Sequence, residues 1–270
     1  MPMNDSRRER LYQTEAIVIG RLDLGEADRI FTVVTPGRGK YRVIAKGVRR
    51  PQSRMAAHLG YFARCGLMLT RGRDLDVVTG AQTLETFDLL QGDLVAFGHA
   101  SYLGELVNRM TEDGEEHRAV YDLLISSLRL LGGSVDSFLV VRHFELALLA
   151  LLGYRPELYR CVGCGNEIEA TANGLSPALG GMVCAACRGG DQPTITLSVN
   201  AQKLLRVLDR SGLSRAAALD VDPRTAAEVE QALTAIIRQH ASRELTSPRV
   251  IREIREGLPA HLPSAVLPSV

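Results

Sequence analysis

The hydrophobic pattern of this chain changes its period near residue 87, and this change limits the folds that are open to it. Before that point, short apolar runs rich in β-branched residues are separated by turn signals such as Pro36-Gly37-Arg38-Gly39. Five such runs within about 75 residues predict a small closed barrel, because closure removes the exposed strand edges. The runs are Ala16–Ile19, Ile30–Val34, Tyr41–Ala45, Leu67–Leu69 and Leu75–Val78.

After residue 87 the apolar residues recur at three- and four-residue spacing, which is typical of helices. Leu89–Met110 and Arg118–Leu131 show this spacing. Ser137–Leu152 is apolar on almost every side, as expected for a helix in the middle of a bundle. Further helices are predicted over 201–211 and from Asp222-Pro223, where an N-cap residue precedes a first-turn proline.

The two patterns predict an α+β protein with the following organisation. Residues 1–85 are expected to form the barrel, for which an OB-type barrel is the natural candidate, although strand number alone does not separate it from an SH3-like one. Residues 86–256 are expected to form an all-helical domain with a loop-rich module inserted at 156–194. Residues 257–270 contain three prolines and no periodicity, and they are expected to form a flexible tail.

Charge is distributed unevenly along the 270 residues, although the formal net charge is only +1. Residues 1–80 carry 15 Lys and Arg against 8 Asp and Glu, and residues 81–160 carry 6 against 12. A basic front third indicates an anionic partner for that part alone. No apolar core follows the charges at 1–10, and the apolar stretch at 146–152 is too short to cross a bilayer. We therefore expect a cytoplasmic protein with no membrane partner.

Four of the five cysteines form a C-x2-C-x19-C-x2-C pattern: Cys161, Cys164, Cys184 and Cys187. Two pairs with this spacing supply four thiolates for one tetrahedral Zn²⁺, and four protein ligands make such a site structural rather than catalytic. A redox pair or an iron–sulfur cluster is a weaker alternative, because the pairs lie among helices and differ from ferredoxin spacing. Cys65 lies in a strand-like run and is expected in the core.

A basic segment without acidic residues lies between positions 36 and 54. Clustered cations of this kind neutralise phosphates, although a charge run is also often just a solvated face. Lys40, Arg42 and Lys46 are expected on one face of a strand, with apolar residues on the other. Few aromatics accompany them, so we expect binding through the nucleic-acid backbone. The candidate aromatics are Phe31, Tyr41, Tyr61 and Phe62, and the candidate cations are Arg38, Lys40, Arg42, Lys46, Arg49, Arg50 and Arg54.

Motifs for catalysis are missing from the sequence. It contains no P-loop, no dinucleotide-binding glycine motif, no His-Glu-x-x-His and no Gly-x-Ser-x-Gly. His143 lies in an apolar helix and is expected to be packed, and the acidic residues at 112–116 are expected in a loop. Two alternatives to a non-catalytic nucleic-acid-binding protein remain at this point. One is a zinc-stabilised module that binds an acidic protein, and the other is a nuclease with scattered carboxylates.

Several short stretches follow one another in a distinctive order. They are Thr14–Ile19, Ala27–Ile30, Gly39–Arg50, Arg142–Leu149, Leu152–Tyr154, the two cysteine pairs and Ser242–Leu245. In this order, the chain from about residue 11 to residue 256 resembles the RecO family of bacterial recombination mediators.

The resemblance implies an OB fold, a helical domain and a zinc module with one structural Zn²⁺. RecO proteins bind single- and double-stranded DNA and anneal complementary strands. In the RecF pathway they act with RecR, and in some settings RecF, to load RecA onto strands coated by single-strand-binding protein, whose C-terminal tail the helical domain receives. They are not enzymes, and they act at the nucleoid. By position, Lys40, Arg42, Lys46, Arg49 and Arg50 are the expected DNA contacts. Further candidates outside the matching stretches are Arg7, Arg8 and Arg10.

Overall fold

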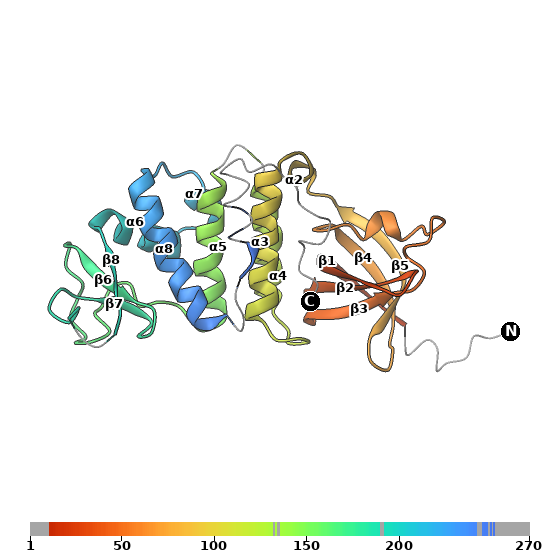
Figure 1. Cartoon of the computed structure of the whole chain (residues 1–270), viewed down its shortest axis with the longest axis horizontal. Helices are drawn as coiled ribbons and strands as arrows, with labels where there is room; N and C mark the ends of the chain where they lie inside the picture. The colour runs from red at the N-terminus through yellow and green to blue at the C-terminus, as the bar shows by residue number, and fades with distance from the viewer. Residues whose placement is uncertain are drawn as a thin grey trace. The chain divides into compact units, whose positions relative to one another are not determined.

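A computed structural model of the chain describes residues 11–131, 133, 136–189, 192–241, 245–247, 249 and 251 (Figure 1). It divides into two compact units. One runs through Leu128 and resumes at Thr246, and the other is Arg129–Leu245. Some of the expectations concern residues outside the described ones, namely Arg7, Arg8, Arg10 and the tail at 257–270.

Five strands close into a barrel in the first unit. Neighbours in the order β1-β2-β3-β5-β4 are hydrogen-bonded, and β4 also pairs with β1. β3 and β5 pair in parallel, at Val43 with Asp76 and Ile44 with Val77, whereas the other neighbours are antiparallel. This strand order is that of an OB-type barrel, so the prediction is confirmed and the SH3-like alternative is not needed. The strands are β1 (Leu11–Leu24), β2 (Asp28–Thr35), β3 (Gly39–Ala45), β4 (Arg64–Thr70) and β5 (Asp76–Glu85), with the 3-10 turn η1 (Ala56–His58) before β4.

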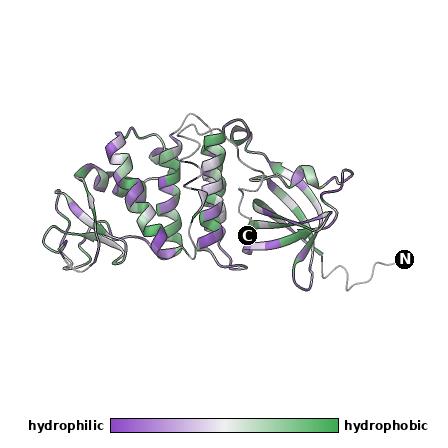
Figure 2. Cartoon of the chain, in the orientation of Figure 1, coloured by the Kyte–Doolittle hydropathy of each residue, from purple (hydrophilic) through white to green (hydrophobic). Residues whose placement is uncertain are grey.

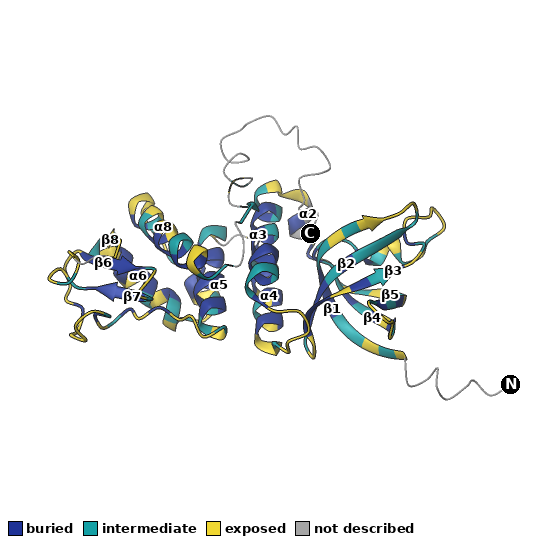
Figure 3. Cartoon of the chain, turned by 60° about the horizontal axis from the view of Figure 1, so that its bottom comes forward, coloured by how far each residue is buried: buried dark blue, intermediate teal, exposed yellow. Residues whose placement is uncertain are grey.

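Side chains alternate between the barrel core and the solvent. The alternation is clearest on β4, where buried residues alternate with more accessible ones. Figure 2 colours the strands by hydropathy and Figure 3 by burial. On β3, Tyr41 and Val43 enter the core, whereas Arg42 is exposed. Phe31 of β2 and Leu67 of β4 belong to the same buried cluster. The two-residue period predicted for the basic strand is therefore correct.

Three helices follow the barrel in sequence: α2 (Asp88–Gly92), α3 (Leu94–Met110) and α4 (Arg118–Leu130). The single helix predicted over 89–110 is wrong at Asp93, which has an extended backbone and separates α2 from α3. The Asp93 carboxylate accepts hydrogen bonds from the N–H groups of Val95 and Ala96, so it is the N-cap of α3. Within the described residues, no helix combines the length and apolar character that a bilayer crossing needs.

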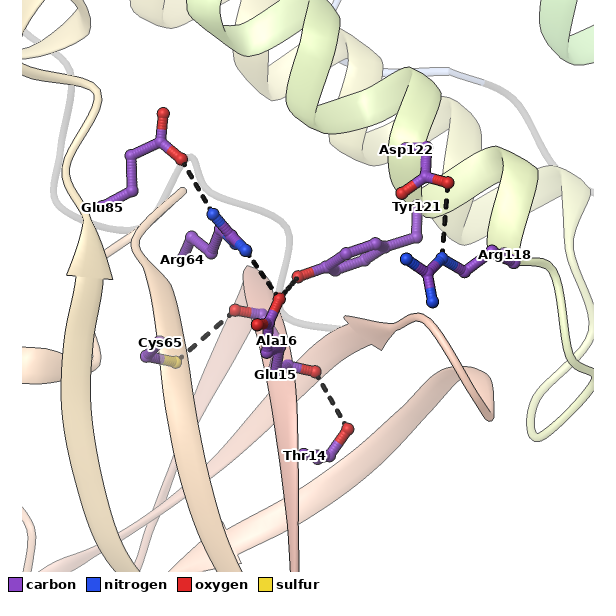
Figure 4. A network of polar contacts seen from close by, with 9 residues as sticks. All are labelled: Thr14, Glu15, Ala16, Arg64, Cys65, Glu85, Arg118, Tyr121 and Asp122. Carbon is purple, nitrogen blue, oxygen red and sulfur yellow. Dashed lines mark hydrogen bonds and ion pairs between the residues drawn. The ribbon is translucent and has the colours of Figure 1, made fainter.

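A polar network at the edge of the barrel holds α4 against it (Figure 4). Arg64 of β4 donates to Glu15 of β1 at 2.7 Å and to Glu85 of β5 at 3.3 Å. The buried Tyr121 of α4 donates to the same Glu15 carboxylate at 3.3 Å. The hydrogen bond from Arg64 holds the pKa of Glu15 below its usual value against the opposing effect of burial. The first unit therefore includes α3 and most of α4, although the predicted domain boundary lies at 85/86.

A buried carboxylate on α3 explains why the chain rejoins this unit at Thr246. Glu105 accepts from the backbone N–H groups of Thr246 at 2.9 Å and Ser247 at 2.8 Å. The backbone N–H groups of Thr246 and Ser247 thereby have an acceptor in the first unit.

The second unit contains four helices, α5 (Ser137–Leu151), α6 (Val199–Arg210), α7 (Leu213–Ala216) and α8 (Pro223–His240). Helix α5 packs against α6, α7 and α8, as its apolar surface predicts. Asp222 caps α8 through the N–H groups of Arg224 and Thr225, which confirms the predicted start at Asp222-Pro223. The short helix α7 was not predicted, because four residues are too few to show a helical period.

The module at 156–194 is more ordered than the loop-rich segment that the sequence predicts. It contains β6 (Asn173–Ser176) and β7 (Gly181–Val183), and β8 (Ile195–Leu197) follows directly. The three strands form one sheet in the order β7-β6-β8. They have only three or four residues each, so their length does not resemble a typical strand, and β6 and β7 each contain a glycine.

Candidate nucleic-acid interface and metal centre

Four cysteine sulfur atoms meet beside the small sheet of the second unit. The Sγ atoms of Cys161, Cys164, Cys184 and Cys187 all lie within 4.8 Å of one another. The Sγ atoms of Cys164 and Cys184 are 3.9 Å apart. A zinc–sulfur bond of about 2.3 Å implies neighbouring sulfur atoms about 3.8 Å apart in a tetrahedron. The predicted convergence of the two pairs is confirmed, and its dimensions fit a tetrahedral ion.

Glycines shape the turn that carries the first cysteine pair. Gly165 has a φ of +78°, a conformation that favours glycine, and its N–H donates to the Cys161 carbonyl at 2.8 Å. Gly163 lies against the second pair, since a Cβ there would come within 3.3 Å of the Cβ of Cys187. In the second turn, the N–H of Cys187 donates to the Cys184 carbonyl at 3.1 Å. The two turns therefore hold their cysteines face to face.

The electrostatics of the cluster also favour a bound cation. Burial opposes ionisation of Cys161, but backbone N–H groups outweigh it and lower the pKa of this thiol to about 6. One of these groups, the N–H of Cys184, lies 3.3 Å from the Cys161 Sγ. Side-chain hydrogen bonds with Cys184 and Cys164 raise the pKa of Cys187 to about 12. A divalent ion would remove this conflict between neighbouring sulfurs. Four protein thiolates leave no position for water, which fits a structural Zn²⁺.

Cys65 is a core residue, as predicted. It is fully buried in the barrel, and burial raises the pKa of its thiol to about 12. Its Sγ donates to the Ala16 carbonyl at 3.6 Å.

Four candidate cations are exposed around strand β3 and the segment that follows it. Among the described residues, no carboxylate forms an ion pair with any of them. Their charge is therefore available to an anionic ligand. We call these residues the barrel cations: Arg42, Lys46, Arg50 and Arg54.

The expectation for Lys40 needs correction. Its side chain is only 8% exposed, and its Nζ donates to the Asn108 carbonyl at 2.7 Å and lies 3.1 Å from the Asp113 carboxylate. The Gly114 N–H also donates to the Lys40 carbonyl at 2.7 Å. The α3–α4 loop thus covers this end of the outward face of β3. The acidic residues at 112–116 lie in that loop, as predicted, but one of them neutralises Lys40.

Arg38 and Arg49 have contacts within the barrel yet remain partly exposed. The Arg38 guanidinium donates to Asp76 at 2.8 Å and lies over the Tyr41 ring, and its side chain is 53% exposed. Arg49 lies 3.4 Å from Asp23 and donates to the Gly25 carbonyl at 3.0 Å. Each of these two cations has a carboxylate partner, and part of its side chain remains accessible to a ligand.

Two further arginines, Arg21 and Arg29, lie on the β1–β2 hairpin and are not among the cations that the basic segment predicts as contacts. Arg29 donates to Asp23 at 2.6 Å, and Arg49 approaches the same carboxylate. Arg21 is exposed and lies over the Tyr61 ring. Both arginines precede the basic segment in sequence. The pairing of β2 with β3 sets Arg29 opposite Ala45 of that segment, and Arg21 pairs with Phe31 of β2, one strand further away.

Of the four candidate aromatics, Phe31, Tyr41 and Phe62 are buried, and only Tyr61 is partly accessible. His143 is also buried, and its Nε2 lies 3.0 Å from the Ser211 carbonyl. Burial lowers the pKa of His143 against the opposing effect of this hydrogen bond. The prediction of a packed histidine is confirmed.

Comparison with known proteins decides the family. The model "Recombination protein O N terminal" matches residues 9–87, and "Recombination protein O C terminal" matches residues 91–249. The chain belongs to the RecO family. The DNA repair protein RecO of Roseiflexus sp. (strain RS-1) is 40% identical over 259 residues, which cover 96% of this chain and 91% of that protein.

Other RecO relatives are similar over nearly their full length. DNA repair protein RecO of Desulforudis audaxviator is 40% identical over 243 residues, covering 90% of this chain and 97% of that protein. That of Symbiobacterium thermophilum is 35% identical over 250 residues, covering 92% and 99%. The resemblance drawn from the short stretches is confirmed, and the RecO family places the chain among DNA repair and recombination proteins.

Lys40 and Arg42 offer a matched pair of variants for this RecO protein. Lys40→Gln is expected to lower the free energy of unfolding by about 1 to 3 kcal/mol, because the covered Asn108 carbonyl loses a charged donor. Arg42→Gln should change stability by no more than about 0.5 kcal/mol, because Arg42 is exposed. Arg42→Gln should also weaken binding to an oligonucleotide more than Lys40→Gln. Urea denaturation and oligonucleotide titration measure both effects, and equal losses of DNA affinity would contradict the structural role of Lys40.

Proposed function

We propose that this protein is a DNA repair and recombination mediator that binds single- and double-stranded DNA through its barrel and anneals complementary strands. With RecR, and RecF in some settings, it helps to load RecA onto strands coated by single-strand-binding protein, whose C-terminal tail it receives. It acts without catalysing a reaction, in the cytoplasm and at the nucleoid.

The observation that carries this proposal is the set of four barrel cations without a carboxylate partner in the described part of the chain. Each can neutralise one phosphate and release a counterion, which favours binding more strongly at low salt than at high salt. Contacts of this kind fix the position of a strand but do not read its bases. Sequence-indifferent binding is what an annealing protein requires, because it must accept any pair of complementary strands.

Annealing follows from the same electrostatics. Two DNA strands repel each other through their phosphates, and a cationic surface lowers this repulsion while it raises the local concentration of strands. The Zn²⁺ that the four cysteines would hold has a different role in this proposal. It fixes the short sheet of the second unit and takes no part in binding DNA.

A direct test compares two anionic ligands in the same salt series. A single-stranded oligonucleotide and an acidic peptide of equal charge are titrated with the protein, and complementary labelled strands are mixed with and without it. We expect tighter binding to the oligonucleotide, faster annealing, and no cleavage in the presence of Mg²⁺ or Mn²⁺. Stronger binding to the peptide would instead favour a protein-interaction module, and cleavage would favour a nuclease.

A further inference from the structure

An exposed arginine lies on an aromatic ring at one edge of the barrel. The guanidinium carbon of Arg21 is 4.6 Å from the centre of the Tyr61 ring. Arg21 is exposed, and within the described residues it forms no ion pair with a carboxylate. A guanidinium over a ring loses water on the side facing the ring but keeps a planar surface toward the solvent.

Tyr61 is held in place by other aromatic residues. Its ring meets Phe97 of α3 edge-on at 6.4 Å and lies 6.0 Å from the Phe62 ring. The Phe62 and Phe97 rings are 5.5 Å apart. Together these contacts fix the orientation of the ring beneath Arg21, so the pair is organised before any ligand arrives.

The turn that presents Tyr61 has an unusual backbone. Phe62 has a φ of +60°, a conformation that is costly for a bulky residue, and it is buried. Its N–H donates to the Val18 carbonyl at 2.8 Å, which anchors the turn to β1. A Cβ at Gly104 of α3 would come within 3.3 Å of the Phe62 ring, so the helix can approach this closely because residue 104 is a glycine. The strain directs Phe62 inward and leaves Tyr61 at the surface.

Two further arginines lie near Arg21, on either side of a shared carboxylate. Arg29 and Arg49 share one carboxylate, Asp23, at 2.6 and 3.4 Å. Arg21 also acts on this carboxylate, since all three arginines help to keep the pKa of Asp23 below its usual value, the hydrogen bond from Arg29 most strongly. At the Asp23 carboxylate itself the arginines outnumber the acid three to one, and the hairpin also carries Glu26 and Asp28. Arg50, one of the barrel cations, is next to Arg49 in the chain.

We propose that Arg21 and Tyr61 form a base-stacking subsite for single-stranded DNA. The proposal rests on the proposed function and adds a contact to a base beside the contacts to phosphates. A base that stacks on the Arg21 guanidinium places its backbone among the neighbouring cations. A duplex already stacks its bases internally and offers no free base face, so this subsite favours single strands.

Charge-preserving variants of the full-length protein separate stacking from electrostatics. Arg21→Lys keeps the charge but removes the planar surface. Arg210→Lys is the matched control, because Arg210 is an exposed arginine over the Tyr159 ring in the second unit. The ligands are an oligothymidine of about 16 nucleotides, near the upper end of the site size of one OB fold, and an abasic strand of equal length with the same phosphates. Binding is measured by fluorescence anisotropy at several salt concentrations.

For the wild-type protein we expect tighter binding to oligothymidine than to the abasic strand. Arg21→Lys should weaken binding to oligothymidine about fivefold, as expected for the loss of one stacked base. It should leave binding to the abasic strand and the salt dependence unchanged, and Arg210→Lys should change neither affinity. If the wild type binds both strands equally well, the subsite is refuted while the proposed function stands. Equal losses by Arg21→Lys on both strands would also refute it.

Discussion

Cys164→Ser is expected to lower the metal content from about one Zn²⁺ per chain to nearly none and to unfold the module around the small sheet. Cys164 is exposed, so the exchange of sulfur for oxygen removes a ligand without opening a cavity in the core. Zinc binding contributes about 10 to 16 kcal/mol to the folding of zinc-finger peptides. The second unit also has helices that pack without the ion, so we expect its free energy of unfolding to fall by several kcal/mol rather than by the whole amount.

Elemental analysis and hydrogen exchange of the same samples measure these effects. Amides between residues 157 and 188 should exchange faster in Cys164→Ser, whereas those of the barrel should not. Cys65→Ser is the matched control, because it alters a buried cysteine outside the cluster and should leave the zinc content unchanged. A wild-type protein that is purified without chelators and contains no metal would contradict the assignment. Iron and sulfide in place of zinc would do so as well.

Replacing the four barrel cations by glutamine is expected to weaken binding to single-stranded DNA on the order of 100-fold at 0.1 M salt, since each lost phosphate contact also forfeits the release of a counterion. Folding should be preserved, because the four side chains are exposed and have no carboxylate partner among the described residues. Fluorescence anisotropy gives the affinities, and thermal denaturation verifies that the barrel is intact. The variant carries Arg42→Gln, Lys46→Gln, Arg50→Gln and Arg54→Gln.

A control variant must remove the same amount of charge elsewhere. Four exposed cations of the second unit serve this purpose, and their loss should weaken DNA binding only a few-fold, on the order of a general charge effect. A loss as large as that of the barrel variant would show that net charge, and not the surface around β3, controls affinity. The control residues are Lys203, Arg210, Arg215 and Arg238.

Much of the fold could be predicted because it depends on short, local patterns in the amino-acid sequence. The apolar runs identified all five barrel strands, since a two-residue period needs only neighbouring positions. The caps at Asp93 and Asp222 show the limit of this approach. Asp222 precedes a proline and was recognised, whereas Asp93 interrupts a continuous apolar spacing, and its capping role appears only in the hydrogen bonds to Val95 and Ala96. Strands β6, β7 and β8 were missed because they have only three or four residues, and β6 and β7 each contain a glycine.

The candidate sites also combine features that the sequence predicts with features that it does not. The cysteine spacing predicted a cluster correctly, because two turns of fixed geometry need little else to converge. The basic segment located a cluster of cations, but its sequence did not show which of them form ion pairs within the protein. Lys40 and Arg42 lie two positions apart on one face of β3, yet Lys40 is covered by the last turn of α3, where it donates to the Asn108 carbonyl 68 residues away in sequence. Arg21 is the converse case, since it lies outside the basic segment in sequence, yet its charge acts on Asp23, the carboxylate that Arg49 of that segment approaches.

The salt dependence of DNA binding by the wild type and the fourfold barrel variant measures most directly whether the barrel cations meet phosphates. Each phosphate contact with a single strand contributes about 0.7 to the slope of log affinity against log salt concentration. With four contacts removed, we expect the slope to become shallower by about 3. If both proteins show the same slope, the barrel cations do not neutralise phosphates in the complex.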